Sequence, residues 1–346
     1  MQTVNNVHSQ DHKRGFAYQM KMVWCQNRAV TLLVIVSTVV AVLGSIGIFW
    51  DDRIVVGAPV WAKTTKFAIS MAVYGATLLW MFSYIQRPNR FMKIFMSATG
   101  YILLLELGLV ITQAIRGQAM HYNFSTPLDG TLYIIMTVGI YLLWGVSMVM
   151  GYIMLRQNLP GKALGWSIRL GLLISVLAGF GLGTLMTNPT ASQMTKITSG
   201  APDAGSIIGA HTVGAEDGGP GLPLLGWSTT HGDLRIPHFF GLHGLQVIPL
   251  IGLMVSRRRE KWLSENHKLT LVIVATAGYV GFVGLVTWQA LRAQSIIAPD
   301  GLTFIVLATL VMATLGSSGL IIGHARLTVK PDLLNPGEKQ AYSSSS

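Results

Sequence analysis

"AVTLLVIVSTVVAVLGSIGIFW", residues 29–50, runs for 22 positions without a charged side chain. A helix needs about 20 predominantly apolar residues to cross the hydrocarbon core of a bilayer. Seven similar segments follow along the chain: 64–85, 94–115, 130–155, 166–186, 237–256, 269–290 and 302–325. A helix satisfies its own backbone hydrogen bonds in lipid, whereas an open sheet does not. The pattern therefore predicts an all-α integral membrane protein with eight transmembrane helices.

The composition agrees with a chain that is surrounded by lipid. Hydrophobic residues make up 51% of the 346 residues and charged residues 11%, with a mean hydropathy of +0.51. Soluble domains carry about 25% charged residues. Most of the surface is therefore expected to face the lipid bilayer, which is the first predicted partner.

The net charge of +11 at pH 7 is explained by the topology of such a protein. Cytoplasmic segments of membrane proteins carry an excess of Lys and Arg. If the N-terminus lies inside, 18 of the 25 basic residues fall on the inner side of the eight spans. The charge pattern predicts that both termini are cytoplasmic, and it gives no reason to expect nucleic acid as a partner.

Two heptapeptides point to an internal duplication. "QAIRGQA" (113–119) closes the third predicted span and "QALRAQS" (289–295) closes the seventh, with four of seven positions identical. Two further pairs occur in the same order: "PLDGTLYIIM" (127–136) with "APDGLTFIVL" (298–307), and "KTTKFAIS" (63–70) with "RIPHFFGL" (235–242). Each half has an even number of spans, so the two halves are expected to form a parallel 4+4 repeat.

The domain organisation follows from this repeat. We expect a cytoplasmic N-terminal segment at 1–28, a first four-helix repeat at 29–155, a second at 166–325, and a cytoplasmic, disordered tail at 326–346. The second repeat includes a long outer loop at 187–235. Loops of this length are either functional or disordered. We expect residues 207–235 to fold back as a lid and residues 190–206 to be looser.

Polar residues that could form a binding site gather on the predicted outer side, near the ends of the spans. Polar and ionisable residues at membrane depth are functional candidates, and Arg and Lys are the usual partners of carboxylates and phosphates. The candidate ligand-binding residues are Lys63, Lys66, Gln113, Arg116, Asp129, Arg235, His243, Gln289, Arg292 and Asp300.

These residues make an outward-facing site the leading functional hypothesis. Such a site would bind or transport an anionic or amphipathic small ligand, or a lipid headgroup. The simpler alternative for each basic residue is contact with lipid headgroups, or pairing with Asp129, Asp233 or Asp300.

The histidines support a competing hypothesis, a heme- or metal-dependent membrane oxidoreductase. Candidate metal ligands are His121, His211, His231 and His238, because borderline metals such as zinc favour imidazole. His238 and His243 are five residues apart, so their rings leave different faces of a helix and do not form a two-ligand clamp. Metal binding would then use the loop histidines, and a heme with a single histidine ligand such as His243 is a further arrangement that the sequence leaves open.

No motif in the chain identifies a reaction, so the sequence leaves open whether the protein is an enzyme. A third alternative is a structural subunit of a homo-oligomer or of a larger membrane complex.

Three segments resemble known proteins. "KFAIS" (66–70), "RGQAMHYN" (116–123) and "GGPGLPLLGWSTTHGDLRIPHFFGLH" (218–243) resemble segments of bacterial multi-pass inner-membrane proteins that carry no assigned function. The resemblance implies a bacterial inner (plasma) membrane location and no particular chemistry. The eight spans in two four-helix repeats are also similar to the heme A synthase family, in span number and repeat symmetry only.

Overall fold

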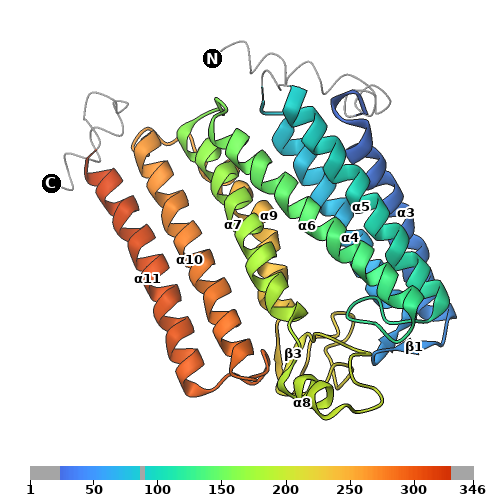
Figure 1. Cartoon of the computed structure of the whole chain (residues 1–346). Helices are drawn as coiled ribbons and strands as arrows, with labels where there is room; N and C mark the ends of the chain where they lie inside the picture. Colours follow the sequence, from blue (N-terminus) through green and yellow to red (C-terminus); the bar gives the residue numbers. More distant parts are fainter. Residues whose placement is uncertain (1–23, 86–89, 329–346) are drawn as a thin grey trace. The chain divides into compact units, whose positions relative to one another are not determined.

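The computed structural model describes residues 24–85 and 90–328, and this part of the chain is mainly helical. It contains eight helices long and apolar enough to cross a membrane (Figure 1). They are α3 Arg28–Trp50, α4 Val60–Phe82, α5 Arg90–Arg116, α6 Pro127–Leu155, α7 Lys162–Thr187, α9 Arg235–Ser256, α10 Glu265–Leu291 and α11 Gly301–Leu327. The eight predicted apolar helices are confirmed, and they indicate a polytopic membrane protein.

Both predicted terminal segments fall largely outside the described residues. The N-terminal segment is described only from Trp24, and Arg28 already begins α3. The predicted tail at 326–346 is described only to residue 328, and α11 runs to Leu327. The expected disorder of the tail concerns residues beyond that point.

Local side-chain caps fix where several helices begin. Asn27, Thr126, Ser264 and Asp300 precede α3, α6, α10 and α11, and each accepts the backbone N–H three residues further on. Such caps satisfy one of the N–H groups that a helix leaves unpaired at its start. The helix boundaries thus depend on short polar residues next to the apolar runs.

The second span begins earlier than its apolar run predicts. A short hairpin, β1 Ile54–Val55 paired with β2 Ala58–Pro59, leads directly into α4 at Val60. The predicted apolar run begins at residue 64, after Lys63, but a lysine near the start of a helix does not interrupt the backbone. Lys63 consequently lies inside α4.

The described residues form two compact units, and each is described by itself. Unit 1 contains α3, α4, α5 and residues Thr131–Met150 of α6. Its three first helices pack against one another in all three pairs. The buried side chains Leu33, Ala68, Met71, Leu103 and Leu107 form one of its cores.

A glycine of α6 leaves room for a buried carboxyl group of α5 in unit 1. A Cβ added to Gly139 of α6 would lie 2.3 Å from Oε1 of Glu106 in α5. The Glu106 side chain is buried, and this oxygen has no hydrogen-bond partner among the described residues. The glycine gives the carboxyl group its space.

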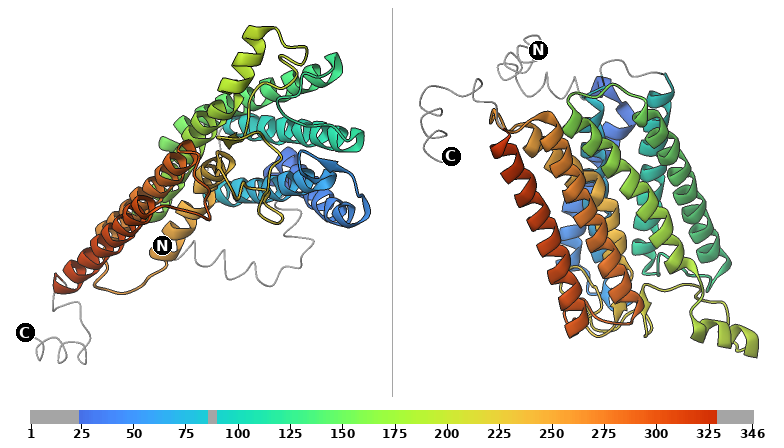
Figure 2. Two further views of the ribbon diagram at one scale, coloured as in Figure 1. Left: turned by 90° about the horizontal axis from the view of Figure 1, so that it is seen from below. Right: turned by 90° about the vertical axis from the view of Figure 1, so that its left-hand side faces the viewer.

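Unit 2 contains Tyr122–Gly130 and the chain from Gly151 onward. Helices α7, α9 and α10 pack in all three pairs, and α11 packs against α10, beside which it runs in Figures 1 and 2. Glycine again permits the closest contact: a Cβ on Gly252 of α9 would lie 1.9 Å from Oγ of Ser167 in α7.

The long connection between α7 and α9, residues 188–234, is called the cap here. It contains α8 Ala191–Ser199, which stands away from the other helices of its unit (Figure 2). Within the stretch 190–206, which is expected to be looser than 207–235, residues 191–199 are thus helical and none of them is buried. A capping box between Thr190 and Gln193 explains the helix, because each side chain bonds the backbone of the other.

The rest of the cap is held by short strand pairings. Strand β3 Thr212–Val213 pairs with β4 Gly232–Asp233, and Asn123 forms an isolated bridge with Ile207. The N–H of Phe124 donates to Ser206, and the N–H of Ile208 donates to Tyr122. The predicted lid segment is thus an ordered part of unit 2.

Candidate functional site

The two similar heptapeptides have the same local structure. The side chain of Gln113 donates to the carbonyl of Ala119 at 3.2 Å, and that of Gln289 donates to the carbonyl of Ser295 at 2.8 Å. Gly117 and Ala293 have φ values of +67° and +57°. Both glutamines are buried. Each glutamine therefore closes the end of its helix, and both backbones turn through a left-handed residue.

Two of the candidate arginines are engaged in ion pairs with aspartates. Asp233, at 1% exposure, accepts hydrogen bonds from Nε and Nη2 of Arg235 at 2.9 and 2.5 Å. Arg292 pairs with Asp300, and its guanidinium lies 4.4 Å from the ring centre of Trp288. The hydrogen bond from Arg292 holds the pKa of Asp300 well below its usual range. The simpler alternative, pairing with acidic residues, thus accounts for both arginines.

Arg116 and the two lysines belong to unit 1. One guanidinium nitrogen of Arg116 donates to Oε1 of Gln113. Lys63 and Lys66 are half-buried on the first two turns of α4. Half-buried cations at a helix end agree equally with contact to headgroups and with a binding role.

Asp129 and Asp300 play different structural parts, although the aligned decapeptides place them together. Asp129 lies in the first turn of α6 and accepts a hydrogen bond from Oγ1 of Thr126 at 2.6 Å. Asp300 is itself the cap of α11, and it is Thr303 that lies in the first turn. A hydroxyl, that of Thr126, caps α6, whereas a carboxylate, that of Asp300, caps α11. By their place at the helix start, Asp300 corresponds to Thr126 and not to Asp129, so the alignment of the decapeptides is three residues out of structural register.

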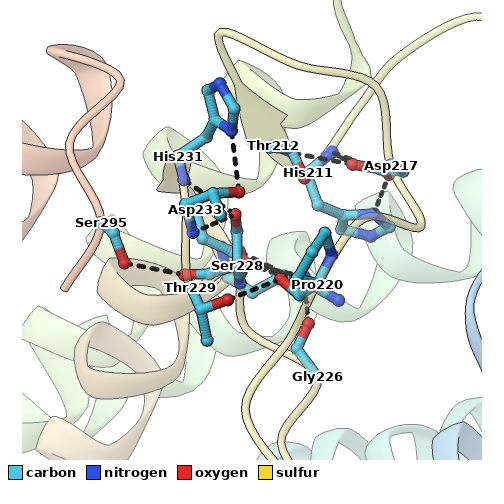
Figure 3. Close-up of polar contacts among 12 residues, drawn as sticks. His211, Thr212, Asp217, Pro220, Gly226, Ser228, Thr229, His231, Asp233 and Ser295 are labelled. Carbon is cyan, nitrogen blue, oxygen red and sulfur yellow. Dashed lines mark hydrogen bonds and ion pairs between the residues drawn. The ribbon is translucent and has the colours of Figure 1, made fainter. Parts of the chain in front are cut away.

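His211 is the most firmly oriented histidine of unit 2 (Figure 3). Its Nδ1 lies 2.6 Å from Oδ2 of Asp217, and Oδ1 of Asp217 also accepts the N–H of Thr212 at 2.8 Å. Burial raises the pKa of Asp217, but the hydrogen bonds from His211 and Thr212 outweigh it and lower the pKa below its ordinary 3.8. The half-buried carboxylate of Asp217 thus fixes the Nδ1 edge of the imidazole.

Three other candidate histidines each have separate neighbours. His231 contacts Oγ1 of Thr230, and Nδ1 of His243 lies 3.1 Å from Oε1 of Gln246. His121, in unit 1, lies beside Phe67 with ring centres 5.7 Å apart. Within residues 24–85 and 90–328, no group of three or more His, Cys, Asp or Glu is placed to hold a metal ion. A metal or heme site remains a prediction.

His238 is a partial exception. Its Nδ1 is buried and has no hydrogen-bond partner among the described residues. The N–H of His238 donates to the carbonyl of Leu234, whose own N–H donates to the carbonyl of His211. His211 and His238 are therefore tied to the same backbone position at the start of α9.

A groove in unit 1 was not anticipated from the sequence. Its volume is about 610 Å³, and it runs along the last turns of α3 beside the first turn of α4 and Ile111 of α5. Apolar side chains form its walls, among them Val40, Leu43 and Ile46. Trp50, Trp61, Asp51 and Asp52 line it where α3 ends. One end of the groove is thus polar and aromatic, and the remainder is apolar.

Two glycines of α3 shape this groove by bringing α4 close. A Cβ on Gly44 would lie 2.5 Å from Oγ1 of Thr65, and a Cβ on Gly47 would lie 2.8 Å from the Trp61 ring. The signal was present in "LGSIGIFWDDR" (43–53), where small residues precede tryptophan and two acids. Small residues in membrane helices commonly permit such close packing.

The polar end of the groove is built around Asp51. Its Oδ2 accepts hydrogen bonds from Nε1 of Trp61 at 2.8 Å and from Nη2 of Arg53 at 2.7 Å. The hydrogen bond from Arg53 is the main reason why the pKa of Asp51 is well below its usual range. The third nitrogen of Arg53, Nη1, donates to the carbonyl of Ile115 at 2.9 Å. Asp51 is therefore a charged and fully bonded group.

Asp52 differs from its neighbour. It is exposed, lines the same groove, and makes no hydrogen bond or ion pair with any residue that the structure describes. Its carboxylate is thus available to a ligand.

Comparison with known proteins adds no family to this geometry. No protein-family model, no curated protein and no solved structure matches the chain.

Proposed function

We propose that this polytopic membrane protein binds an amphipathic ligand in the groove of unit 1, on the side predicted to be outer. The observation that carries the proposal is the division of the groove into apolar walls and a charged end. Its volume of about 610 Å³ lies within the range of small-molecule sites, roughly 300–1,000 Å³.

The aromatic residues support a position at the membrane surface. Tryptophan is enriched at the level of the lipid headgroups, where an apolar ring and a polar N–H are both satisfied. Trp50 and Trp61 line the charged end of the groove. Val40 and Leu43 lie earlier in α3, away from the charged end of the groove, at the depth expected for acyl chains. A ligand in the groove would have its apolar part against these walls and its polar part at the aspartates.

Of the two ligand classes considered from the sequence, this geometry favours the amphipathic one. An anionic ligand was expected because of basic residues such as Arg235 and Arg292. Each of these pairs with an aspartate, so neither contributes an uncompensated positive charge. Transport would additionally need two alternating conformations, which the parallel 4+4 repeat could supply.

The repeat is itself part of the proposal. In each unit the first three long helices pack in all three pairs, and the third ends in the same glutamine-closed turn. We infer that the two units are copies of one ancestral four-helix unit. Cytoplasmic termini and a bacterial inner membrane are proposed on the charge bias and the resemblance described above.

A redox function is the second candidate, and the unpartnered Nδ1 of His238 beside His211 favours it. A heme ligated there would give a Soret band in purified protein, and a bound metal would appear in elemental analysis. Protein with neither, prepared under mild conditions, would contradict this candidate.

Filling the groove tests the leading proposal. Leu43 and Val42 are neighbours on α3 with similar exposure, 62% and 57%, but only Leu43 lines the groove. Leu43→Trp should therefore remove space from the groove, whereas Val42→Trp adds the same ring elsewhere on the helix.

The measurement is the phospholipid retained per chain after purification in detergent, extracted and quantified by mass spectrometry. We expect Leu43→Trp to retain several-fold less lipid than wild type and Val42→Trp to match wild type. Equal retention by all three proteins would refute the proposal.

A further inference from the structure

The charges at the end of the groove indicate which polar group it recognises. We propose that the ligand of this groove is a membrane lipid with a primary ammonium headgroup, bound by the carboxylate of Asp52 and the ring of Trp50. The inference rests on the proposed function, because it concerns the same groove.

The first step is that Asp51 and Arg53 cancel one another. Nε and Nη2 of Arg53 donate to the Asp51 carboxylate at 2.9 and 2.7 Å, and Nη1 is bound by the carbonyl of Ile115. Each of the three guanidinium nitrogens thus already donates one hydrogen bond within the protein, and the ion pair has no net charge. The groove therefore does not present a built anion site at this end.

The second step is that Asp52 remains as an uncompensated negative charge. It is exposed, it lines the groove, and it has no bonding partner among residues 24–85 and 90–328. A carboxylate accepts several hydrogen bonds, and a primary ammonium group has three donors. Charge complementarity thus favours a cationic headgroup over an anionic one.

The third step concerns the aromatic ring beside this charge. Trp50 is 83% exposed and lines the same end of the groove. The face of an indole attracts cations, tryptophan most strongly among the aromatic residues. The two groups together suit an ammonium that hydrogen-bonds to the carboxylate while it contacts the ring.

The apolar walls then decide the source of this ammonium. Val40, Leu43, Ile46 and Ile111 continue the groove away from the charged end. A water-soluble amine would leave these side chains uncovered, whereas an acyl chain would cover them. Phosphatidylethanolamine, a bilayer phospholipid, combines both parts.

The test is a competition between two lipids. Full-length protein in detergent is equilibrated with equal amounts of phosphatidylethanolamine and phosphatidylglycerol, washed, and extracted. The ratio of the retained lipids is measured for wild type, Asp52→Asn and Asp52→Glu. Asp203→Asn is the control, because Asp203 is an exposed acid of unit 2 that pairs with Lys196.

Wild type should prefer phosphatidylethanolamine, and Asp52→Asn should lower the ratio by about fivefold, the upper range for one exposed ion pair. Asp52→Glu should keep most of the preference, and Asp203→Asn all of it. Raising the salt concentration should weaken the preference of wild type but not that of Asp52→Asn, because salt screens exposed charges.

The two proposals fail in different ways. An unchanged ratio in Asp52→Asn, together with loss of lipid in Leu43→Trp, would overturn the headgroup assignment and leave the groove in place. If Leu43→Trp retains as much lipid as wild type while Asp52→Asn changes the lipid ratio, Asp52 contacts headgroups without a groove. That result would overturn the proposed function. Wild-type behaviour of both variants would overturn both.

Discussion

Removing the carboxylate of Asp233 should open the cap of unit 2. Its side chain is fully buried and accepts hydrogen bonds from the N–H of Ser228 at 2.8 Å and from the N–H of Arg235 at 3.0 Å. It also receives the Arg235 guanidinium, which in turn donates to the carbonyl of Gly226 at 2.6 Å. One carboxylate thus connects the cap to the start of α9.

The size of the effect follows from this burial. Removing one partner of a buried ion pair destabilises by about 3–5 kcal/mol, because the other charge is left without compensation. The side chain of Arg235 is 33% exposed, so water replaces part of what it loses. We therefore expect Asp233→Ala to lower the free energy of cap opening by about 3 kcal/mol, which raises the open population about 100-fold.

Limited proteolysis measures that population. When opening is fast relative to cleavage, the cleavage rate follows the population of the open form. Chymotrypsin should cut at Trp227, within the cap, about 100-fold faster in Asp233→Ala than in wild type. The control is Asp203→Ala, which removes an ion pair exposed on both sides and should change the rate little. Cleavage of Asp233→Ala at the wild-type rate would refute the reasoning.

Two further predictions concern the same cap. The pKa of Asp217 in the folded protein lies below its unfolded value of about 4. The Asp217 carboxylate therefore stabilises the folded cap fully above that pH, and this stabilisation is lost as the pH falls further. Hydrogen exchange at the amide of Thr212, corrected for its intrinsic pH dependence, should accelerate below pH 4 in wild type but show no such step in Asp217→Asn. Gly232→Ala should destabilise the cap strongly, because its Cβ would lie 1.9 Å from the carbonyl oxygen of Ala290, whereas Gly219→Ala meets nothing within 4 Å. Thermal unfolding of the two variants should differ accordingly, and equal midpoints would contradict the packing seen at Gly232.

The helices could be predicted closely because a membrane-spanning helix is recognised from a long run of apolar residues in the sequence. Span 302–325, for example, became α11 Gly301–Leu327. At α4 the predicted start differs by four residues, because Lys63 lies inside a helix whose start is fixed by the preceding hairpin. Hydropathy carries no information about a hairpin of two-residue strands.

The candidate site was less predictable because charge alone does not show pairing. Arg235 and Arg292 were identified correctly as polar residues near span ends, but their partners Asp233 and Asp300 lie close enough to neutralise them. At the other extreme, Asp51 and Asp52 are adjacent in sequence and differ only in whether Arg53 and Trp61 reach them. That distinction depends on how the backbone turns after α3.

The pairing of Tyr122–Phe124 with Ser206–Ile208 has a consequence for how the protein is made. The two segments are about 80 residues apart in the chain. At 5–20 residues per second, the ribosome supplies the second segment roughly 4–16 s after the first. During that time α6, α7 and α8 are synthesised, while the segment before α6 lacks its partner. Unit 2 is therefore completed only after the second segment has been made, and a translation pause before residue 206 would prolong the state in which the first segment is unpaired.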